Sequence, residues 1–415
     1  MEKENVQFRK NFIWNVLGTG LNAFNSLFFM IIVTRLNGVD QAGIFTIAFS
    51  TACIIYFVGV YAGRIYQVTE NNDKISDTDY IVNRLISSGA VIIIVILFVI
   101  FKGYNLYKST IFVALSTYKA LEAISEVFYG ILQKNDLLNI VGKSSFIKAI
   151  TSLIAFVIVD LITKNVLLSS ISISIIYILV IFLYDIKKTK NVIDYKKFNC
   201  KRAISIFKSG FFTFAISFLG LYMTNAPKYA IDKFLTEDIQ AIFGIIIMPA
   251  TVMGLVAQFL IHPYLNQIFE LYKNGNLIKL KKLLYRIIAS ILIIGIICSI
   301  AGYTLGTQVL GIIYGLNLGI YKIQLFIILI GATFYTLAGI ISPVLITMRC
   351  TKIQFVVYVI MALIELILCN VLVMKIGFNG AIWAYFITMF LYCITFFIVA
   401  MKVINSKKLL LEGGN

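Results

Sequence analysis

The sequence is poor in residues that interrupt helices and in residues that build catalytic or metal centres. Its 415 residues include four prolines and one histidine, and charged residues make up 13% of the chain. Few prolines favour long helices, because a proline removes a backbone donor and kinks the helix that contains it. The six cysteines show no CxxC or other metal-ligand spacing, and no Walker-type phosphate loop occurs. We therefore expect no cofactor, no metal and no ATP hydrolysis by this chain.

Apolar residues, in contrast, are abundant. They make up 60% of the chain, and the mean hydropathy is +0.93. Soluble globular proteins contain about 45–50% apolar and about 25% charged residues. The sequence therefore predicts an all-α integral membrane protein with twelve transmembrane helices, each long enough to span a bilayer. The predicted spans are 12–33, 43–63, 85–101, 107–132, 145–162, 167–184, 209–231, 241–265, 287–308, 323–347, 354–374 and 380–401.

Lysine and arginine gather in the short loops between these spans, where they account for most of the net charge of +17. If the N-terminus lies in the cytoplasm, most of this charge falls on the inner side, as the positive-inside rule requires. We therefore expect cytoplasmic N- and C-termini (N-in/C-in) and no nucleic-acid partner.

The longest loop is also the most basic, and it divides the spans six and six. We expect an N-terminal six-helix lobe at 1–184, a basic cytoplasmic linker at 185–208, a C-terminal six-helix lobe at 209–401 and a cytoplasmic tail at 402–415. The charge of the linker follows from this topology, or else the linker binds anionic lipid or a substrate diphosphate.

A charged stripe crosses the fourth span. Lys119, Glu122 and Glu126 are spaced by three and four residues, which places them on one face of a helix. An ionisable residue at the bilayer centre costs roughly 2.5–3.5 kcal/mol even on the mildest insertion scale. Such a face is tolerated where it contacts water, partner groups or a cavity. We therefore expect a polar path inside the protein, with Lys119, Glu122 and Glu126 as candidates for contact with a substrate or an ion.

Small and polar residues follow one face of the first span at spacings of three and four, namely Asn11, Asn15, Gly18, Asn22 and Asn25. This face either supports close helix packing through interhelical hydrogen bonds or forms a cavity wall that donates to sugar hydroxyls. Arg64, after the second span, either reaches lipid phosphates or faces the mouth of a cavity. The candidate substrate-binding residues here are Asn15, Asn22, Asn25 and Arg64.

The second half of the chain adds further candidates. Asn225, Lys228 and Asp232 share one face of the seventh span. We expect Asn225 and Lys228 to contact an anionic headgroup, although Lys228 could instead reach the outer surface by snorkelling. His262 in the eighth span is either a hydrogen-bonded packing residue or a proton-handling group. Glu365 in the eleventh span either pairs with a lysine or takes part in proton or sodium coupling. Together with Asp232 these two residues complete the candidates for ion coupling.

Four stretches of the chain resemble a known family. They are EAISEVFYGILQKNDLLNIVGKS at 122–144, the loop 64–84 with its YQVT, TRLNGVDQAGIF at 34–45 and NAPKYAID at 225–232. With these stretches the chain resembles the Wzx-type polysaccharide flippases, which serve capsule and O-antigen assembly within the multidrug/oligosaccharidyl-lipid/polysaccharide exporter superfamily. The resemblance covers nearly the whole chain and becomes thin after residue 300.

The resemblance implies two six-helix lobes around a central cavity that is enriched in cations, here Arg64, Lys119 and Lys228, with Arg35 a weaker match. It also implies transport, rather than catalysis, of a polyprenyl-diphosphate-linked oligosaccharide from the inner to the outer leaflet of a bacterial plasma membrane. We expect alternating access, with membrane lipid, a proton or sodium ion, and the polysaccharide polymerase machinery as further partners. The glutamates of 107–132 are not explained by substrate attraction, since they would repel a diphosphate.

Two other functions stay open on the sequence. A cation-coupled multidrug or metabolite antiporter of the same superfamily would need a smaller, more aromatic and anionic pocket. A membrane glycan polymerase would use Glu122 and Glu126 as an acid–base pair. The mid-span position of these two residues and the short predicted outer loops disfavour the polymerase, which would more plausibly carry a larger external loop with catalytic groups.

Overall fold

Every regular element in the described part of this computed structural model is a helix, which confirms the predicted all-α class. The structure describes residues 2–61, 63–69, 75–261, 264–348 and 350–412. The chain divides into two compact units, Met1–Leu221 and Tyr222–Asn415. Helix α9 (Cys200–Phe234) therefore begins in the first unit and ends in the second.

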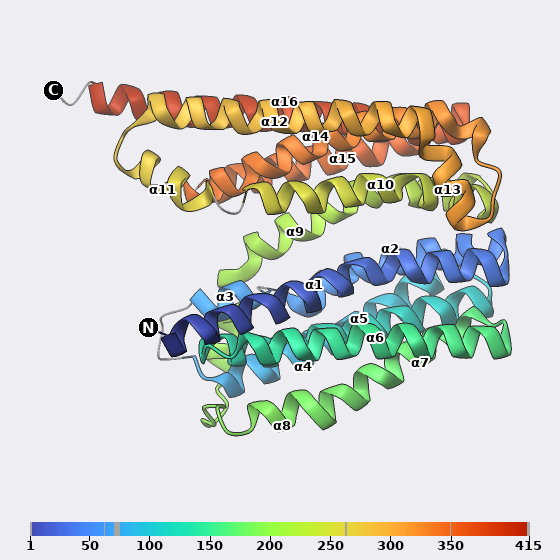
Figure 1. Ribbon diagram of the computed structural model, residues 1–415, viewed down its shortest axis with the longest axis horizontal. Coiled ribbons are helices and arrows are strands. Elements are labelled where there is room, and N and C mark those ends of the chain that lie inside the picture. Colours follow the sequence, from blue (N-terminus) through green and yellow to red (C-terminus); the bar gives the residue numbers. More distant parts are fainter. Residues whose placement is uncertain (1, 62, 70–74, 262–263, 349, 413–415) are drawn as a thin grey trace. The chain divides into compact units, whose positions relative to one another are not determined.

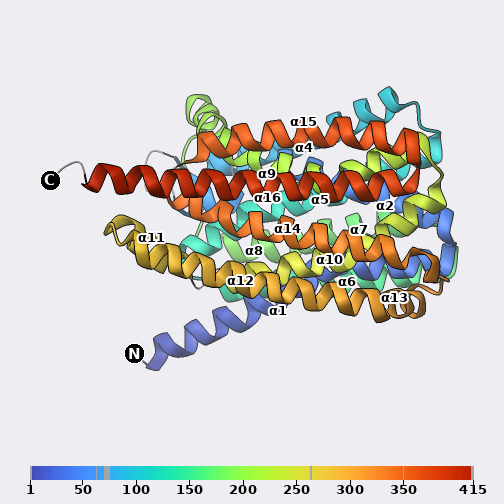
Figure 2. The ribbon, with the colours of Figure 1, turned by 90° about the horizontal axis from the view of Figure 1, so that it is seen from above.

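The first unit is built from long helices that run side by side (Figures 1 and 2). Besides the start of α9, its helices are α1 Glu2–Asn37, α2 Val39–Val60, α3 Gly63–Thr69, α4 Asp77–Lys102, α5 Leu106–Lys134, α6 Leu138–Thr163, α7 Val166–Val180 and α8 Ile186–Thr189. A π-helical turn, Ile181–Asp185, joins α7 to α8. Helix α1 packs along α6, and α5 packs against α2, α4 and α7.

The second unit is organised around α14, which packs against α10, α12 and α16. Its helices are α10 Glu237–Ile261, α11 Leu265–Lys273, α12 Leu277–Ala301, α13 Thr307–Tyr314, α14 Lys322–Thr347, α15 Thr351–Ile376 and α16 Phe378–Glu412. A π-helical turn, Gly302–Gly306, joins α12 to α13, and a short 3₁₀ turn, Gly319–Tyr321, precedes α14.

The described residues of each predicted span are helical, apart from Tyr61 in the turn after α2. Among the described residues, eleven helical segments are long and apolar enough to cross a membrane, by length and composition. The twelfth predicted span is α5, which has 29 residues and differs by its mid-helix charges. The fifth and sixth spans are separate helices, because α6 ends at Lys164 in the left-handed conformation and the Asn165 side chain caps α7.

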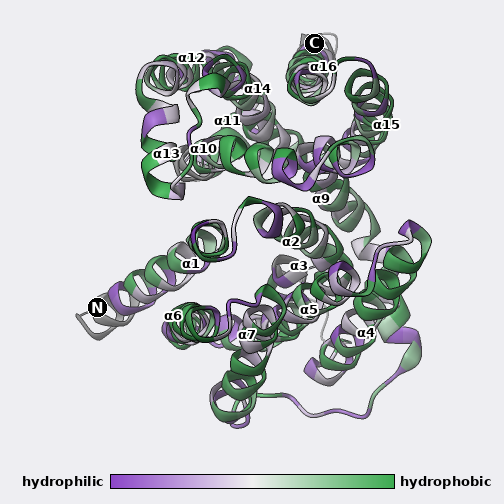
Figure 3. Ribbon diagram, turned by 90° about the vertical axis from the view of Figure 1, so that its right-hand side faces the viewer, coloured by the Kyte–Doolittle hydropathy of each residue, from purple (hydrophilic) through white to green (hydrophobic). Residues whose placement is uncertain are grey.

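The outward faces of these helices carry large apolar side chains. On α4, Leu97, Ile100 and Phe101 are 61%, 69% and 90% exposed. Soluble proteins rarely expose contiguous apolar patches of more than a few hundred Å², whereas hydrocarbon is a suitable environment for them. Figure 3 shows hydrophobic colour dominating the long helices. The chain is a multi-pass membrane protein.

Helices α1 and α6 approach each other closely at two glycines. A Cβ atom at Gly18 would overlap the carbonyl of Gly142, and a Cβ at Gly142 would overlap the backbone of Trp14. The Ser145 hydroxyl donates to the Gly18 carbonyl at 3.1 Å. Small residues at a helix crossing allow such backbone contact in membranes. The spacing of Gly18 within the first span therefore serves helix packing.

We expect Gly18→Ala to destabilise the protein by about 1–3 kcal/mol, because the added methyl group overpacks the crossing. Gly20→Ala is the matched control, since a Cβ at Gly20 meets no atom within 4 Å. The control should be neutral or slightly stabilising, because alanine favours the helix. Thermal unfolding of both purified variants in detergent is the measurement, and equal midpoints would contradict the packing argument.

Candidate functional site

The charged stripe of α5 faces a cavity of about 170 Å³ inside the first unit. Its wall is contributed by five helices. The charged and amide side chains of the wall are Asn22 from α1, Arg64 from α3, Glu122 and Glu126 from α5, and Lys148 from α6; α7 adds Tyr177. A cavity of this size has room for several water molecules and is lined by enough polar atoms to hold them. Four of the residues expected at the site, Asn22, Arg64, Glu122 and Glu126, thus lie together.

Glu122 is held from two sides. Lys119 Nζ donates to Glu122 Oε2 at 2.6 Å, and Asn22 Nδ2 donates to Glu122 Oε1 at 3.1 Å. The Lys119 ammonium also lies 4.8 Å from the ring centroid of Tyr118 and 5.4 Å from that of Phe49, within cation–π range. Lys119 therefore forms an ion pair with Glu122 and neutralises its charge.

Glu126 has a looser partner. Arg64 Nε lies 3.8 Å from Glu126 Oε2, and the two side chains are 24% and 21% exposed. A charge-assisted hydrogen bond is about 2.7–2.9 Å long, so this pair leaves room for a water or a cation at the carboxylate. Of the carboxylates in the wall, Glu126 is the one best placed to exchange its partner.

The most deeply buried ion pair beside the cavity was not predicted from the sequence. Lys148 Nζ donates to Asp185 Oδ2, to Ser125 Oγ at 2.7 Å and to Tyr129 OH at 3.1 Å. The Lys148 and Asp185 side chains are 2% and 0% exposed. The available signal was a lysine within the span 145–162, the same kind of signal that identified the α5 stripe.

A π-helical turn places the partner of this lysine. Asp185 is the last residue of the turn Ile181–Asp185, and its Oδ1 accepts from Ser144 Oγ at 2.5 Å. Single π-helical turns occur frequently at functional sites. The pair ties α6 to the end of α7 and, through Ser125 and Tyr129, to α5.

Three ion pairs lie at the site. Arg64, Lys119 and Lys148 lie against three carboxylates, those of Glu126, Glu122 and Asp185 respectively. A cavity of this volume, with both signs of charge in its wall, has room for water or a small hydrated ion.

The other candidates of the first unit lie away from the cavity wall. Asn25 is 1% exposed and donates to the Ala149 carbonyl at 3.1 Å, which joins α1 to α6. Asn11 donates to the Asp136 carbonyl and accepts from the Asn139 amide. Asn15 is half-buried on α1. Of the asparagines on this face of α1, Asn22 thus lies in the cavity wall, whereas Asn11 and Asn25 join α1 to neighbouring segments.

In the second unit, the structure brings two of the candidates together. Lys228 Nζ donates to Asn225 Oδ1 at 2.9 Å, and both residues are 8% exposed. Asp232 is half-buried one turn further along α9. His262 lies outside the described residues.

Glu365 is enclosed within the second unit, with 0% exposure on α15. Its Oε1 accepts from Cys369 Sγ at 3.2 Å. Thr388, which is also 0% exposed, is a further hydrogen-bond partner of the carboxyl. Glu365 is thus held by a thiol and a hydroxyl.

Comparisons with known proteins extend this description. No protein-family profile matches the chain. The capsular polysaccharide biosynthesis protein CapF of Staphylococcus aureus is 26% identical over 396 residues, which cover 94% of this chain and 98% of that protein. An inward-facing multidrug-resistance MATE family transporter of the MOP superfamily superposes with a TM-score of 0.76 at 11% identity, covering 95% of this chain and 99% of its own.

The lipid II flippase MurJ, in an inward closed conformation, superposes with a TM-score of 0.64 at 16% identity, covering 97% of this chain and 90% of its own. The chain has the MATE and MurJ transporter fold. The resemblance to proteins of capsule assembly that the sequence predicted is confirmed by the capsular relative, and the two solved structures show the shared fold.

We expect Lys148→Met to destabilise the protein by about 3–5 kcal/mol, because it leaves Asp185 buried without its partner. The double variant Lys148→Met with Asp185→Leu should recover most of this loss, since both charges are then absent. The measurement is unfolding of purified protein in detergent.

The control for this prediction is Lys196→Met. Lys196 pairs with Asp194 at 2.7 Å, and both side chains are more than half exposed, so the loss should be at most about 1 kcal/mol. A double variant as unstable as Lys148→Met itself would contradict the pairing argument.

Proposed function

We propose that this protein is a flippase that moves a polyprenyl-diphosphate-linked oligosaccharide across the bacterial plasma membrane for surface polysaccharide assembly. The observation that carries the proposal is the similarity to a capsular polysaccharide biosynthesis protein over 94% of the chain. A fold shared with a flippase of lipid II, at TM-score 0.64, supports it.

The physical obstacle is the passage of a diphosphate and a sugar chain through hydrocarbon, where each unpaired polar group costs several kcal/mol. In the proposed mechanism the protein replaces water around these groups while the polyprenyl tail stays in lipid. In this proposal, Asn22, Arg64 and Lys119 are the headgroup-binding candidates of the first unit, and Asn225 and Lys228 are those of the second. Alternating access would carry the headgroup between leaflets without catalysis. The polysaccharide polymerase machinery would then receive the lipid-linked oligosaccharide.

The cavity of the first unit suits the coupling step of this mechanism. Glu126 has a loose partner in Arg64 at 3.8 Å, so a proton or a sodium ion can compete for the carboxylate. An arriving diphosphate would draw Arg64 or Lys119 away and raise the affinity of the glutamates for the ion. Asp232, His262 and Glu365 are the further coupling candidates.

We expect Glu126→Gln to flatten the dependence of transport on pH and membrane potential, because glutamine imitates a permanently protonated carboxyl. Stimulation of flipping by an imposed ion gradient should fall by roughly fivefold or more, while the amount of protein in the membrane stays the same. Flipping of lipid-linked saccharide in proteoliposomes is the measurement. Glu270→Gln, an exposed carboxylate on α11, is the control. Parallel loss of transport and abundance would indicate a folding role for Glu126.

The proposed function itself is tested by a mass-spectrometric census of polyprenyl-diphosphate saccharides in cells with and without the gene. Their sidedness is read from cleavage by an impermeant glycan-cleaving enzyme. We expect one complete repeat unit to accumulate in the inner leaflet. An unchanged pool would favour a drug or metabolite antiporter, which the MATE-like fold makes the nearest alternative. Accumulation in the outer leaflet would favour a polymerase.

A further inference from the structure

The segment from the start of α8 to the first residues of α9 is rich in lysine and arginine. We call this segment, residues 186–202, the basic strap. It contains seven lysines and arginines against a single acid, Asp194. The first-unit cavity does not use any of these residues, and the proposed transport mechanism does not need them.

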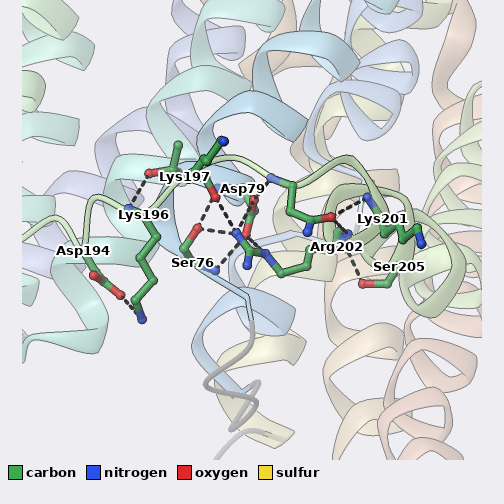
Figure 4. Close-up of polar contacts among 10 residues, drawn as sticks. Ser76, Asp79, Asp194, Lys196, Lys197, Lys201, Arg202 and Ser205 are labelled. Carbon is green, nitrogen blue, oxygen red and sulfur yellow. Dashed lines mark hydrogen bonds and ion pairs between the residues drawn. The ribbon is translucent and has the colours of Figure 1, made fainter.

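The strap is fixed along the first turn of α4 (Figure 4). The backbone amide of Asp194 donates to Asp77 Oδ2 at 3.0 Å, and the amide of Lys196 donates to Thr78 Oγ1 at 3.3 Å. The amide of Asn199 donates to Asp79 Oδ1 at 3.0 Å. The strap is therefore held through its backbone, and the side chains between these amides are left on the surface.

A buried carboxylate anchors the end of the strap. Asp79 is 0% exposed. It accepts from Arg202 Nε at 2.6 Å and from Arg202 Nη2 at 3.3 Å. It also accepts from the amide and the hydroxyl of Ser76 at 3.0 and 2.8 Å. Arg202 thus pairs with Asp79, whereas the lysines of the strap do not contact this carboxylate.

The exposed side chains of the strap combine aromatic rings with lysines. Tyr195 is 68% exposed and Phe198 39% exposed, and the lysines beside them are also exposed, namely Lys187, Lys188, Lys190, Lys196, Lys197 and Lys201. Exposure of two aromatic rings to water is unfavourable. Their exposure at a bilayer interface is favourable, because the interface accommodates an apolar ring beside a cation.

The residues that precede the strap indicate its position relative to the hydrocarbon of the bilayer. Phe182 and Leu183 are 66% and 71% exposed on the π-helical turn, as expected of side chains in contact with hydrocarbon. Lys187 and Lys188 follow Leu183 by four and five residues. A helical rise of about 1.5 Å per residue places these lysines roughly 6–8 Å beyond the leucine. The headgroup region of one leaflet is about 5–8 Å thick, so the step from leucine to lysine matches the step from hydrocarbon to headgroups.

We propose that the basic strap is a binding surface for anionic phospholipid headgroups, with the lysines contacting the phosphates and Tyr195 and Phe198 inserting between headgroups. The charge complementarity is strong, since exposed lysines outnumber the one acid, which already pairs with Lys196 at 2.7 Å. Each lysine at an anionic surface strengthens association by about fivefold. The surface keeps this end of the connection to α9 in the plane of the membrane.

The test is native mass spectrometry of the full chain in detergent, titrated with phosphatidylglycerol or with phosphatidylcholine. We expect tighter binding of phosphatidylglycerol, and at least a tenfold loss of that binding in the variant Lys187→Gln, Lys188→Gln, Lys197→Gln, Lys201→Gln. The matched control removes four exposed lysines from the second unit, as Lys273→Gln, Lys279→Gln, Lys282→Gln, Lys402→Gln. The control should retain the tightest phosphatidylglycerol association.

A second variant keeps every lysine and distinguishes lost lipid binding from a folding defect. Tyr195→Ser with Phe198→Ser should weaken phosphatidylglycerol binding several-fold without changing the thermal unfolding midpoint. Unaltered phosphatidylglycerol binding in both strap variants, or an equal loss in the control, would overturn the proposal. Tighter, strap-dependent binding of a polyprenyl diphosphate than of phosphatidylglycerol would assign the strap to the transported substrate instead.

Discussion

Neutralisation of charge inside hydrocarbon is the constraint on which the first unit depends. The Lys148–Asp185 pair is almost completely enclosed, and an ion taken out of water is stable there because its partner and further hydrogen bonds replace the solvent. Ser125, Tyr129 and Ser144 supply those bonds. The same contacts hold α5, α6 and the end of α7 together, so they also fix the wall of the cavity.

The three ion pairs around the cavity differ in how firmly they are made. Lys148 is buried with its partner, Lys119 is caged by aromatic rings beside Glu122, and Arg64 stands 3.8 Å from Glu126. This gradation allows one pair to open while the others keep the helices in register. The wall of this cavity holds both signs of charge, and the proposed mechanism assigns ion coupling to it.

The surface of the protein follows the same physical division. Large apolar side chains cover the outward faces of the spans, as at Phe101 with 90% exposure, because hydrocarbon does not penalise them. At the ends of the helices the surface changes to lysines and aromatic rings. The basic strap shows this change within a few residues, from Leu183 to Lys187, and its backbone is anchored on α4 by Asp79.

The sequence by itself determined the spans and the presence of charge inside them. Apolar runs of bilayer length form helices because the backbone has no other way to satisfy its polar groups in lipid, and the spacing of Lys119, Glu122 and Glu126 places them on one face. The tertiary structure decided which charges meet. Lys148 and Asp185 lie 37 positions apart, and Asn25 packs against α6 while Asn22 reaches the cavity. Helical periodicity predicts the face that a side chain occupies, but the neighbour of that face is set by how the helices pack, which local sequence patterns do not encode.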